Sequence, residues 1–157
     1  LLEAGAVGAN IEDVVHSEGK RVRERQEHAD YIAAARQAAD EAGVAFVING
    51  RTDALKLGTD VFADPLTEAA ERVTLMVQAG ARAVYPVGLS TAEQVIRLAD
   101  AAGEVPLNVT AHPVDGHAAG DLSELTALGV RRVTFGPLWQ MWLAEVSKER
   151  LRTWAPH

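Results

Sequence analysis

Apolar runs of strand length recur along the chain, and a helix-like segment that ends in glycine precedes each of them. A glycine in this place closes a helix because it adopts the left-handed backbone conformation, and a short step from helix to strand is typical of an αβ loop. Repeated β-α units of this kind predict a parallel sheet whose strands are joined by right-handed crossovers. The five apolar runs occupy residues 6–11, 44–48, 81–85, 105–109 and 130–135.

The segments between the apolar runs have the composition and the end signals of helices. Residues 24–42 are rich in Ala, Glu, Gln and Arg and carry a narrow apolar face. Asp64 is a candidate N-cap with Pro65 in the first helical position, and the Ser-Thr-Ala-Glu sequence at 90–93 has the form of a capping box. Two further helices are expected, a short one over residues 121–128 and a longer one over residues 139–151.

These units predict the fold class. A (β/α)8 barrel, or TIM barrel, takes about 250 residues, or roughly 31 per unit, so the 157 residues of this chain match the five units counted. Because the sequence begins inside a helix tail, we expect an α/β protein that forms the C-terminal part of such a barrel without its first three units, with residues 1–157 as a single domain. The alternative is a complete five-stranded doubly wound sheet, which suits the same length.

Composition places the chain among ordinary globular proteins, since 48% of its residues are hydrophobic and 24% are charged. The formal net charge of -7 argues against a surface for nucleic acid or for an anionic membrane. Without cysteine the chain has no disulfide, no thiolate zinc site and no cysteine nucleophile. No apolar run approaches the roughly 20 residues that a membrane-spanning helix needs, so we expect a soluble, cytoplasmic protein that binds neither nucleic acid nor membrane.

One strand end stands out as a candidate site. The apolar run 44–48 is followed, after an Asn-Gly step, by Arg51, Thr52 and Asp53. Strands buried on both faces are continuous apolar runs, and in α/β folds ligands bind at the carboxyl ends of such strands. Arg binds a carboxylate or phosphate through two parallel hydrogen bonds, so Arg51 is the first candidate for substrate binding and catalysis. In the alternative interpretation, Arg51 and Asp53 form a structural pair that fixes the loop.

Other strand ends carry further candidates. Glu12 and Asp13 follow the first apolar run, and carboxylate oxygens suit Mg²⁺, which usually takes one or two protein carboxylates; alternatively, these acids cap a helix or pair with an Arg. Asn108 and Thr110 alternate with apolar neighbours and are expected to face a cavity, unless backbone groups satisfy the Asn108 amide. Gly136 follows the last run and leaves room for backbone amides to approach an anionic substrate.

Four segments resemble the isocitrate lyase/phosphoenolpyruvate mutase superfamily, and most of all its phosphonomutase-like, 2-methylisocitrate-lyase-like branch. They occur in the same order and at similar intervals along essentially the whole chain, and the Arg-Thr-Asp-Ala block is the most specific part. The segments are Gly-Ala-Asn-Ile-Glu-Asp at 8–13, Phe-Val-Ile-Asn-Gly-Arg-Thr-Asp-Ala at 46–54, Pro-Leu-Asn-Val at 106–109 and Val-Arg-Arg-Val-Thr-Phe-Gly-Pro at 130–137.

The resemblance implies the C-terminal portion of a (β/α)8 barrel of the phosphoenolpyruvate/pyruvate type that binds Mg²⁺ and a 2-oxo acid. Such an enzyme makes or breaks a C–C or P–C bond through an enolate of pyruvate or a related species. On the matching positions, Glu12 belongs to the shell of Mg²⁺ and water. Arg51 grips the substrate carboxylate or stabilises the developing negative charge, and Asn108 contacts the distal part of the substrate.

The resemblance also implies a gating loop and an oligomer. His16 and Lys20 belong to the stretch that would close over the site. A homo-tetramer is implied in which the last helix packs on a neighbouring subunit, and Trp139, Trp142 and Leu143 suit such a contact because aromatic residues are enriched at interfaces. Alternatively, these three side chains close the floor or rim of the barrel itself.

Two departures from the family pattern shape the expected chemistry. The lyases use a gating-loop cysteine as acid, and this chain has none, which disfavours cysteine-dependent isocitrate cleavage and favours decarboxylation or hydrolysis of an oxo acid. The stretch 14–20 resembles neither that loop nor the loop of the mutase, so the general acid is not identified. Two alternatives stay open: another barrel aldolase that uses a metal enolate, and a truncated, inactive barrel that binds a carboxylate without turnover.

Overall fold

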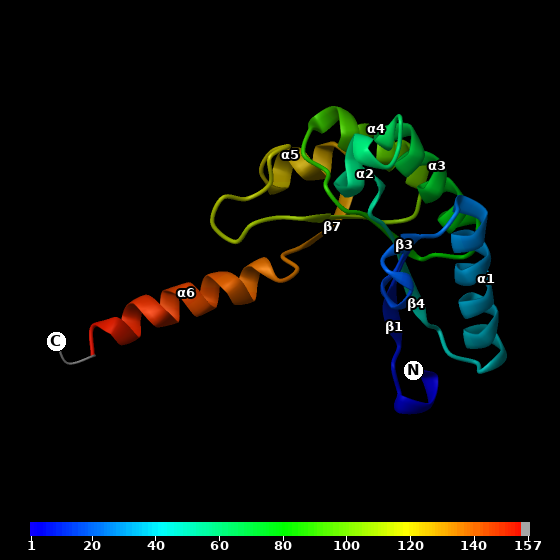
Figure 1. Ribbon diagram of the computed structural model, residues 1–157, viewed down its shortest axis with the longest axis horizontal. Helices are drawn as coiled ribbons and strands as arrows, with labels where there is room; N and C mark the ends of the chain where they lie inside the picture. The colour runs from blue at the N-terminus through cyan, green and yellow to red at the C-terminus, as the bar shows by residue number, and fades with distance from the viewer. Residues whose placement is uncertain (155–157) are drawn as a thin grey trace.

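The computed structural model describes residues 1–154 and is built around a five-stranded parallel sheet (Figure 1). From one edge to the other, the strands follow their order in the sequence without a reversal. A doubly wound sheet reverses its strand order at the topological switch point, so that alternative is wrong and the sheet is part of a barrel wall. The strands are β1 (Gly8–Glu12), β4 (Val47–Thr52), β5 (Ala83–Pro86), β6 (Leu107–Thr110) and β7 (Val130–Thr134).

Helices connect these strands. They are α1 (Arg25–Glu41), α2 (Ala54–Leu57), α3 (Pro65–Gln78), α4 (Ala92–Ala102), α5 (Leu122–Ala127) and α6 (Leu138–Arg152). The helices α1, α3, α4 and α5 lie along one side of the sheet, whereas α6 extends away from the rest of the molecule (Figure 1). A helix layer on one side only is the arrangement of a barrel's outer ring. Within the described part of the chain, no helix is long and apolar enough to cross a membrane.

Buried and exposed side chains alternate along the strands, so the sheet has one face packed against the helices and one face without helices. Ile48 is fully buried, whereas the preceding residue, Val47, keeps 45% of its surface exposed. Successive strand residues point to opposite sides of a sheet, so Ile48 packs against the helix layer and Val47 lies on the other side. The packed face joins strand and helix residues in one core, which includes Ile32, Ile48, Val73, Val84, Leu98, Leu107 and Val109.

The side of the sheet opposite the helices is called the inner face here. Residues paired on neighbouring parallel strands point to the same side, and pairing joins Asn10 to Asn49 and Arg51 to Tyr85. Asn49 and Arg51 lie two and four residues after Val47, so they share its side. The inner face is therefore polar, and it carries Asn10, Asn49, Arg51, Tyr85 and Asn108.

The local end signals of the helices are confirmed, with one shift. Asp64 and Pro65 begin α3 as N-cap and first residue. The capping box of α4 starts one residue later than expected, with Thr91 as N-cap and Gln94 as its partner. Gln94 Oε1 accepts hydrogen bonds from the backbone amides of Ser90 and Thr91 at 2.9 and 3.3 Å. The amide side chain, which follows the predicted glutamate, therefore sets the register of the box.

Short elements that the sequence pattern does not predict complete the fold. Two of them, between β1 and α1, pair as an antiparallel hairpin that lies beside the end of β1. Its turn contains a left-handed residue. The elements are η1 (Leu2–Ala4), β2 (Val14–Val15), η2 (His16–Glu18), β3 (Arg21–Val22) and η3 (Gly58–Asp60).

Substitution of the neighbouring residues Ile48 and Val47 tests the assignment of the two faces. Ile48→Ala leaves a cavity in the core, and we expect it to lower the free energy of unfolding by about 2–5 kcal/mol. Val47→Ala is the matched control, and we expect a change within about 0.5 kcal/mol because this side chain lies outside the core. Urea unfolding followed by circular dichroism measures both values. Equal losses in the two variants would contradict the assignment.

Candidate active site

Three side chains from neighbouring strands form a row at the carboxyl ends of the strands, on the inner face. Strand pairing places Glu12 beside Arg51, and Arg51 beside Tyr85. Glu12 Oε2 lies 3.0 Å from Arg51 Nη2, and the guanidinium carbon of Arg51 lies 5.9 Å from the centre of the Tyr85 ring. Glu12 and Arg51, two of the predicted site residues, thus meet. Tyr85 is not among the predicted site residues. The sequence signal for it was the alternation of strand residues, because Tyr85 stands between Val84 and Pro86, which are both buried.

A second carboxylate, Asp53, fixes the Arg51 side chain. Nε and Nη2 of Arg51 donate to Asp53 Oδ1 and Oδ2 at 2.7 and 3.0 Å, and Lys56 Nζ donates to Oδ2 at 3.1 Å. The bond to Asp53 raises the pKa of Arg51. Burial acts to raise the pKa of Asp53, but the bonds from Arg51 and Lys56 outweigh it and hold that pKa below its usual value. The structural pair is therefore real, yet Arg51 Nη1 has no hydrogen-bond partner among residues 1–154.

Asp13 lies on the packed face, one residue beyond Glu12, and has no exposed surface. Thr52 Oγ1 donates to its Oδ2 at 2.6 Å, and the backbone amide of Asp53 donates to its Oδ1 at 3.0 Å. Arg72 Nη1 donates to Oδ2 at 3.3 Å. Both oxygens are used in joining β1 to β4, so Asp13 is placed as a structural brace and not as the metal ligand predicted. Adjacent strand residues face opposite sides, which separates it from Glu12.

A buried ion network lies behind Asp13 and ties α3 to α1. Arg72, only 2% exposed, donates to Glu68 Oε1 at 2.7 Å and to the Arg23 carbonyl oxygen at 2.9 Å. Arg25 Nε donates to Glu68 Oε2 at 2.9 Å. Burial acts to raise the pKa of Glu68, but the bonds from Arg25 and Arg72 hold it below its usual value. The only sequence signal for this network was the four-residue spacing of Glu68 and Arg72 on one helix.

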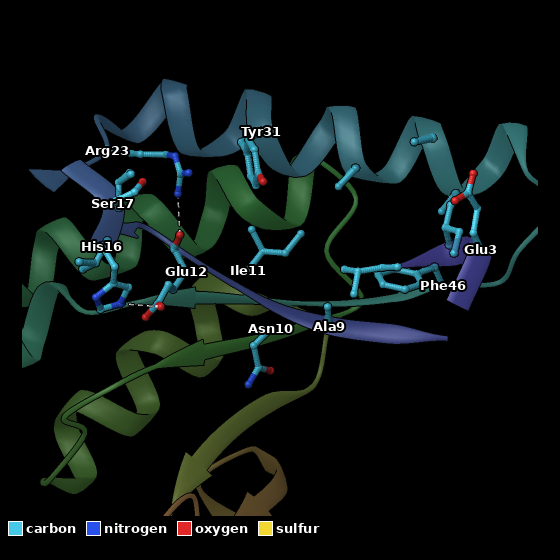
Figure 2. Close-up of a pocket in the computed structure, with 17 residues that line it drawn as sticks. Glu3, Ala9, Asn10, Ile11, Glu12, His16, Ser17, Arg23, Tyr31 and Phe46 are labelled. Atoms are coloured by element: carbon cyan, nitrogen blue, oxygen red, sulfur yellow. Dashed lines mark hydrogen bonds and ion pairs between the residues drawn. The ribbon is translucent and has the colours of Figure 1, made fainter. Parts of the chain in front are cut away.

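The segment predicted to be a gating loop forms the β2–β3 hairpin, which lies next to Glu12 (Figure 2). His16 Nε2 lies 2.9 Å from Glu12 Oε1, and Arg23 Nη1 donates to the Glu12 carbonyl oxygen at 2.8 Å. Lys20 is exposed in the hairpin turn with a φ of 65°. Within residues 1–154, no hydrogen bond or ion pair joins Lys20 to the row. The structure therefore brings His16, but not Lys20, to the site.

On the other side of the row, β6 and β7 add polar groups to the inner face. The Tyr85 hydroxyl lies 2.5 Å from Thr110 Oγ1. Asn108 Nδ2 donates to Thr134 Oγ1 at 3.2 Å, and its Oδ1 is buried without a partner in the described part of the chain. Gly136 has a φ of 50°, and a Cβ added there would lie 3.8 Å from Thr110 Cγ2. Asn108 and Gly136 therefore lie close to the Tyr85–Thr110 pair.

Glu12 keeps capacity for a ligand. Its Oε2 is buried and, although 3.0 Å from Arg51 Nη2, is not aligned for a hydrogen bond. Residues 1–154 contain no group of three or more His, Cys, Asp or Glu side chains that could hold a metal ion. Mg²⁺ usually takes only one or two protein carboxylates and completes its shell with water and substrate. Glu12 therefore fits Mg²⁺ as a single protein ligand or through a water molecule.

A groove of about 730 Å³ runs between β1 and α1 and reaches the row (Figure 2). Ile11 and Phe46 make part of its wall apolar, while Glu12 and His16 lie together towards one end. Arg51 does not line this groove. The groove therefore borders the row, and the row itself faces the inner side of the sheet.

His28 of α1 is a buried titratable group close to Asp13 and Arg51. It is 1% exposed, and among residues 1–154 neither ring nitrogen has a well-aligned hydrogen-bond partner. The Arg51 carbonyl oxygen provides only a weak polar contact. Burial lowers the pKa of His28 to about 4, although the negative charge of Asp13 opposes that effect. The imidazole is therefore neutral in the folded protein at neutral pH.

Comparison of the sequence with known proteins gives a match to a protein family and a match to a single protein, which cover different shares of the chain. The profile of the family described as phosphoenolpyruvate phosphomutase matches residues 1–153. The chain is also 34% identical over 118 residues to 2-methylisocitrate lyase of Escherichia coli K12. That alignment covers 70% of this chain and 37% of the lyase, so the chain spans well under half of that relative.

Comparison of the structure finds barrels of the same superfamily. A provisionally assigned phosphonomutase from Burkholderia cenocepacia J2315 superposes with a TM-score of 0.82 and 33% identity, covering 98% of this chain and 60% of that protein. Oxaloacetate acetylhydrolase in complex with the inhibitor 3,3-difluorooxalacetate superposes with a TM-score of 0.75 and 26% identity, covering 96% of this chain and 50% of that protein. The expected fold, part of a TIM-barrel wall, is confirmed.

His28→Leu tests the buried imidazole through the pH dependence of stability. The pKa falls from 6.5 to about 4 on folding, so between these values the unfolded chain binds more protons and stability decreases as the pH falls. At 1.36 kcal/mol per pKa unit, this group should cost roughly 3 kcal/mol by the acid end of the window. The leucine variant should lack that loss. Urea unfolding at several pH values measures it, and parallel curves for the two proteins would refute the assignment.

Proposed function

The chain belongs to the phosphoenolpyruvate phosphomutase family, and from this membership and the geometry of the row we propose a Mg²⁺-dependent lyase or mutase that acts on a small 2-oxo acid. The reaction makes or breaks a C–C or P–C bond next to the oxo carbon, through an enolate of pyruvate. The observation that carries the proposal is Arg51, held at the carboxyl ends of the strands between Glu12 and Asp53. Since the chain spans half or less of several relatives, the proposal concerns the whole protein.

Arg51 is suited to bind the carboxylate of an oxo acid. Asp53 accepts hydrogen bonds from its Nε and Nη2. These bonds fix the guanidinium before any ligand binds. A pre-oriented cation loses little side-chain entropy on binding and stabilises negative charge as it develops. Nη1, which has no hydrogen-bond partner among residues 1–154, offers donors to a carboxylate. The poorly aligned contact with Glu12 can give way to a substrate oxygen.

Glu12 would hold Mg²⁺, directly or through water. The ion, when bound, would polarise the oxo group and stabilise the negative charge of the enolate. His16, at 2.9 Å from Glu12 Oε1, would orient this carboxylate, as hydrogen-bonded neighbours of metal ligands generally do. Asn108 would contact the distal part of the substrate, and the backbone at Gly136 would approach an anionic group there.

The absence of cysteine favours decarboxylation or hydrolysis of an oxo acid over cysteine-dependent isocitrate cleavage. The likeness to oxaloacetate acetylhydrolase, at 26% identity, supports a short oxo diacid as substrate. A second candidate is a barrel that binds a carboxylate without turnover. The engaged oxygens of Asp13 favour this second candidate, because of the two adjacent acids only Glu12 is then left to hold a metal ion.

Turnover measured for the unchanged protein and for the Arg51→Ala variant distinguishes the two candidate functions. In the full-length protein we expect Mg²⁺-dependent turnover of at least one of oxaloacetate, phosphonopyruvate and 2-methylisocitrate. The variant should lower kcat/KM by about 10²–10³-fold, as expected for the loss of a donor that stabilises developing charge. Pyruvate is measured by coupling to lactate dehydrogenase, and oxalate is measured separately. Reactions without protein correct for decarboxylation of oxaloacetate by the metal alone.

Arg97→Ala is the matched control, because Arg97 is an exposed arginine on α4 away from the row, and it should leave kcat/KM unchanged. Turnover that survives Arg51→Ala would contradict the role of Arg51. Binding of oxalate without turnover of any substrate would support the inert barrel. Neither binding nor turnover would remove both candidates.

We propose in addition that the protein is a homo-oligomer whose subunits meet through α6. None of the α6 residues is buried, and Trp139, Leu143 and Val146 are 39%, 42% and 45% exposed. Their spacing of four and three residues places them on one face of the helix. Trp139 also contacts the rings of Phe135 and Trp142, each with centroids 5.3 Å apart. An apolar stripe on a projecting helix (Figure 1) favours a subunit contact over closure of the barrel's own rim.

The double substitution Leu143→Asp/Val146→Asp tests this contact. We expect the full-length protein to have the mass of a tetramer and the double variant to have a smaller mass, because two charges are then placed in the apolar stripe. Ala144→Asp is the control, since it adds a charge to the same helix away from the stripe. Analytical ultracentrifugation measures the masses. A variant that keeps the wild-type mass would exclude α6 as the contact.

A further inference from the structure

Tyr85 completes the row at the strand ends and has no role in the function proposed so far. Its backbone pairs with Arg51 on one side, and β5 pairs with β6 on the other. The ring lies beside the Arg51 guanidinium, at 5.9 Å from ring centre to guanidinium carbon. The side chain is half-buried, so its hydroxyl lies on the inner face at the height where a ligand of Arg51 would bind.

A short hydrogen bond holds this hydroxyl. Tyr85 Oη and Thr110 Oγ1 are 2.5 Å apart, at the short end of the range for two hydroxyl groups. When Thr110 donates this bond, the Tyr85 O–H is free to donate to a ligand. The same bond stabilises the phenolate once the proton has left, because hydrogen bonds to an ionised oxygen are about twice as strong as neutral ones.

The two carboxylates that contact the Arg51 guanidinium are already engaged. The hydrogen bonds from Arg51 and Lys56 hold the pKa of Asp53 below its usual value, although burial acts to raise it, so Asp53 is ionised. Glu12 contacts both Arg51 and His16 and is the candidate ligand of Mg²⁺. Since the chain has no cysteine, the Tyr85 hydroxyl is the donor that faces the same side as Arg51 and is also held in place.

We propose that Tyr85 supplies the proton that the enolate carbon takes up after bond cleavage, and that Thr110 positions the Tyr85 hydroxyl for this transfer. This role rests on the function proposed above. In the decarboxylation of an oxo diacid, the bond between the methylene carbon and the departing carboxylate breaks, carbon dioxide leaves, and the electron pair of that bond stays with the pyruvate part as an enolate. The methylene carbon then forms a C–H bond as the Tyr85 O–H bond breaks, and the product is pyruvate. The phenolate accepts a hydrogen bond from Thr110 and regains its proton from water.

The reverse of this step gives a direct test. If Tyr85 exchanges a proton with the methyl carbon, the full-length enzyme with Mg²⁺ in deuterated water should replace the methyl protons of pyruvate by deuterium, as followed by proton NMR. Tyr85→Phe should slow this exchange by about 10²-fold or more, the usual contribution of a general acid or base. Its affinity for oxalate, a planar mimic of the enolate, should stay unchanged in calorimetric titration, which shows that the variant is folded.

Tyr31→Phe is the matched control. Tyr31 is the other tyrosine of the chain; it is 52% exposed on α1, with its ring 4.5 Å from Arg23, and its substitution should leave exchange unchanged. Equal exchange by the wild type and Tyr85→Phe would overturn the role of Tyr85 and leave the proposed function standing. Oxalate binding without exchange in the wild type would also overturn the Tyr85 role alone. Neither binding nor exchange would overturn the proposed function and, with it, this role.

Thr110 is tested by a pair of substitutions. Thr110→Val removes the hydroxyl and should slow exchange about 10-fold or more, the cost of losing a hydrogen bond to a charged group. Thr110→Ser keeps the hydroxyl and should hold exchange near the wild-type rate, although it removes the methyl group that the valine variant retains. Equal exchange in the valine and serine variants would show that Thr110 only packs against Tyr85, and would overturn its positioning role.

Discussion

The carboxylate of Asp13 determines how the ends of β1 and β4 are held together. It is inaccessible to solvent, and it accepts hydrogen bonds from the Thr52 hydroxyl and from the Asp53 backbone amide. With this residue held on the packed face, the residue before it must point to the inner face, where Glu12 meets Arg51. The geometry of the candidate site is therefore a consequence of a buried brace one residue away. Asp13 lies in the core, and its neighbour Glu12 faces the candidate site.

Sequence pattern alone predicts the β-α units and their parallel pairing, because the signals are local. A left-handed glycine, a capping residue and an apolar run each act within a few residues, as the confirmed start of α3 at Asp64 and Pro65 illustrates. The choice between Glu12 and Asp13 also depends on a local signal, which the prediction of both acids as metal ligands did not use. The alternation of β1 contained it, since the partly buried Ile11 packs against the core and Asp13, two residues later, must share its side. Adjacent acids after an apolar run are therefore not equivalent candidates.

The rest of the site depends on which strands and helices become neighbours, and composition does not reveal that. Tyr85 joins the row only through the register that pairs β5 with β4, and its hydroxyl reaches Thr110 from the next strand. The same reasoning applies to Arg72, whose buried charge is balanced by Glu68 on the same helix and by Asp13 at the end of β1. Buried ions of this kind require partners that are far apart in sequence. Neither the Tyr85–Thr110 contact nor the Arg72–Asp13 contact has a signature within a window of ten or fifteen residues.

The polarity of the inner face explains how one sheet serves both stability and function. Branched apolar side chains fill the interior of a typical barrel, whereas here Asn49 donates to Asn10 at 2.7 Å and Asn108 donates to Thr134 at 3.2 Å. The amide oxygens of Asn49 and Asn108 remain buried without donors among residues 1–154. Such atoms are costly unless water, a ligand or another part of the protein supplies a donor. The packed face therefore holds the apolar core of the sheet, and the inner face presents polar groups with unused acceptors.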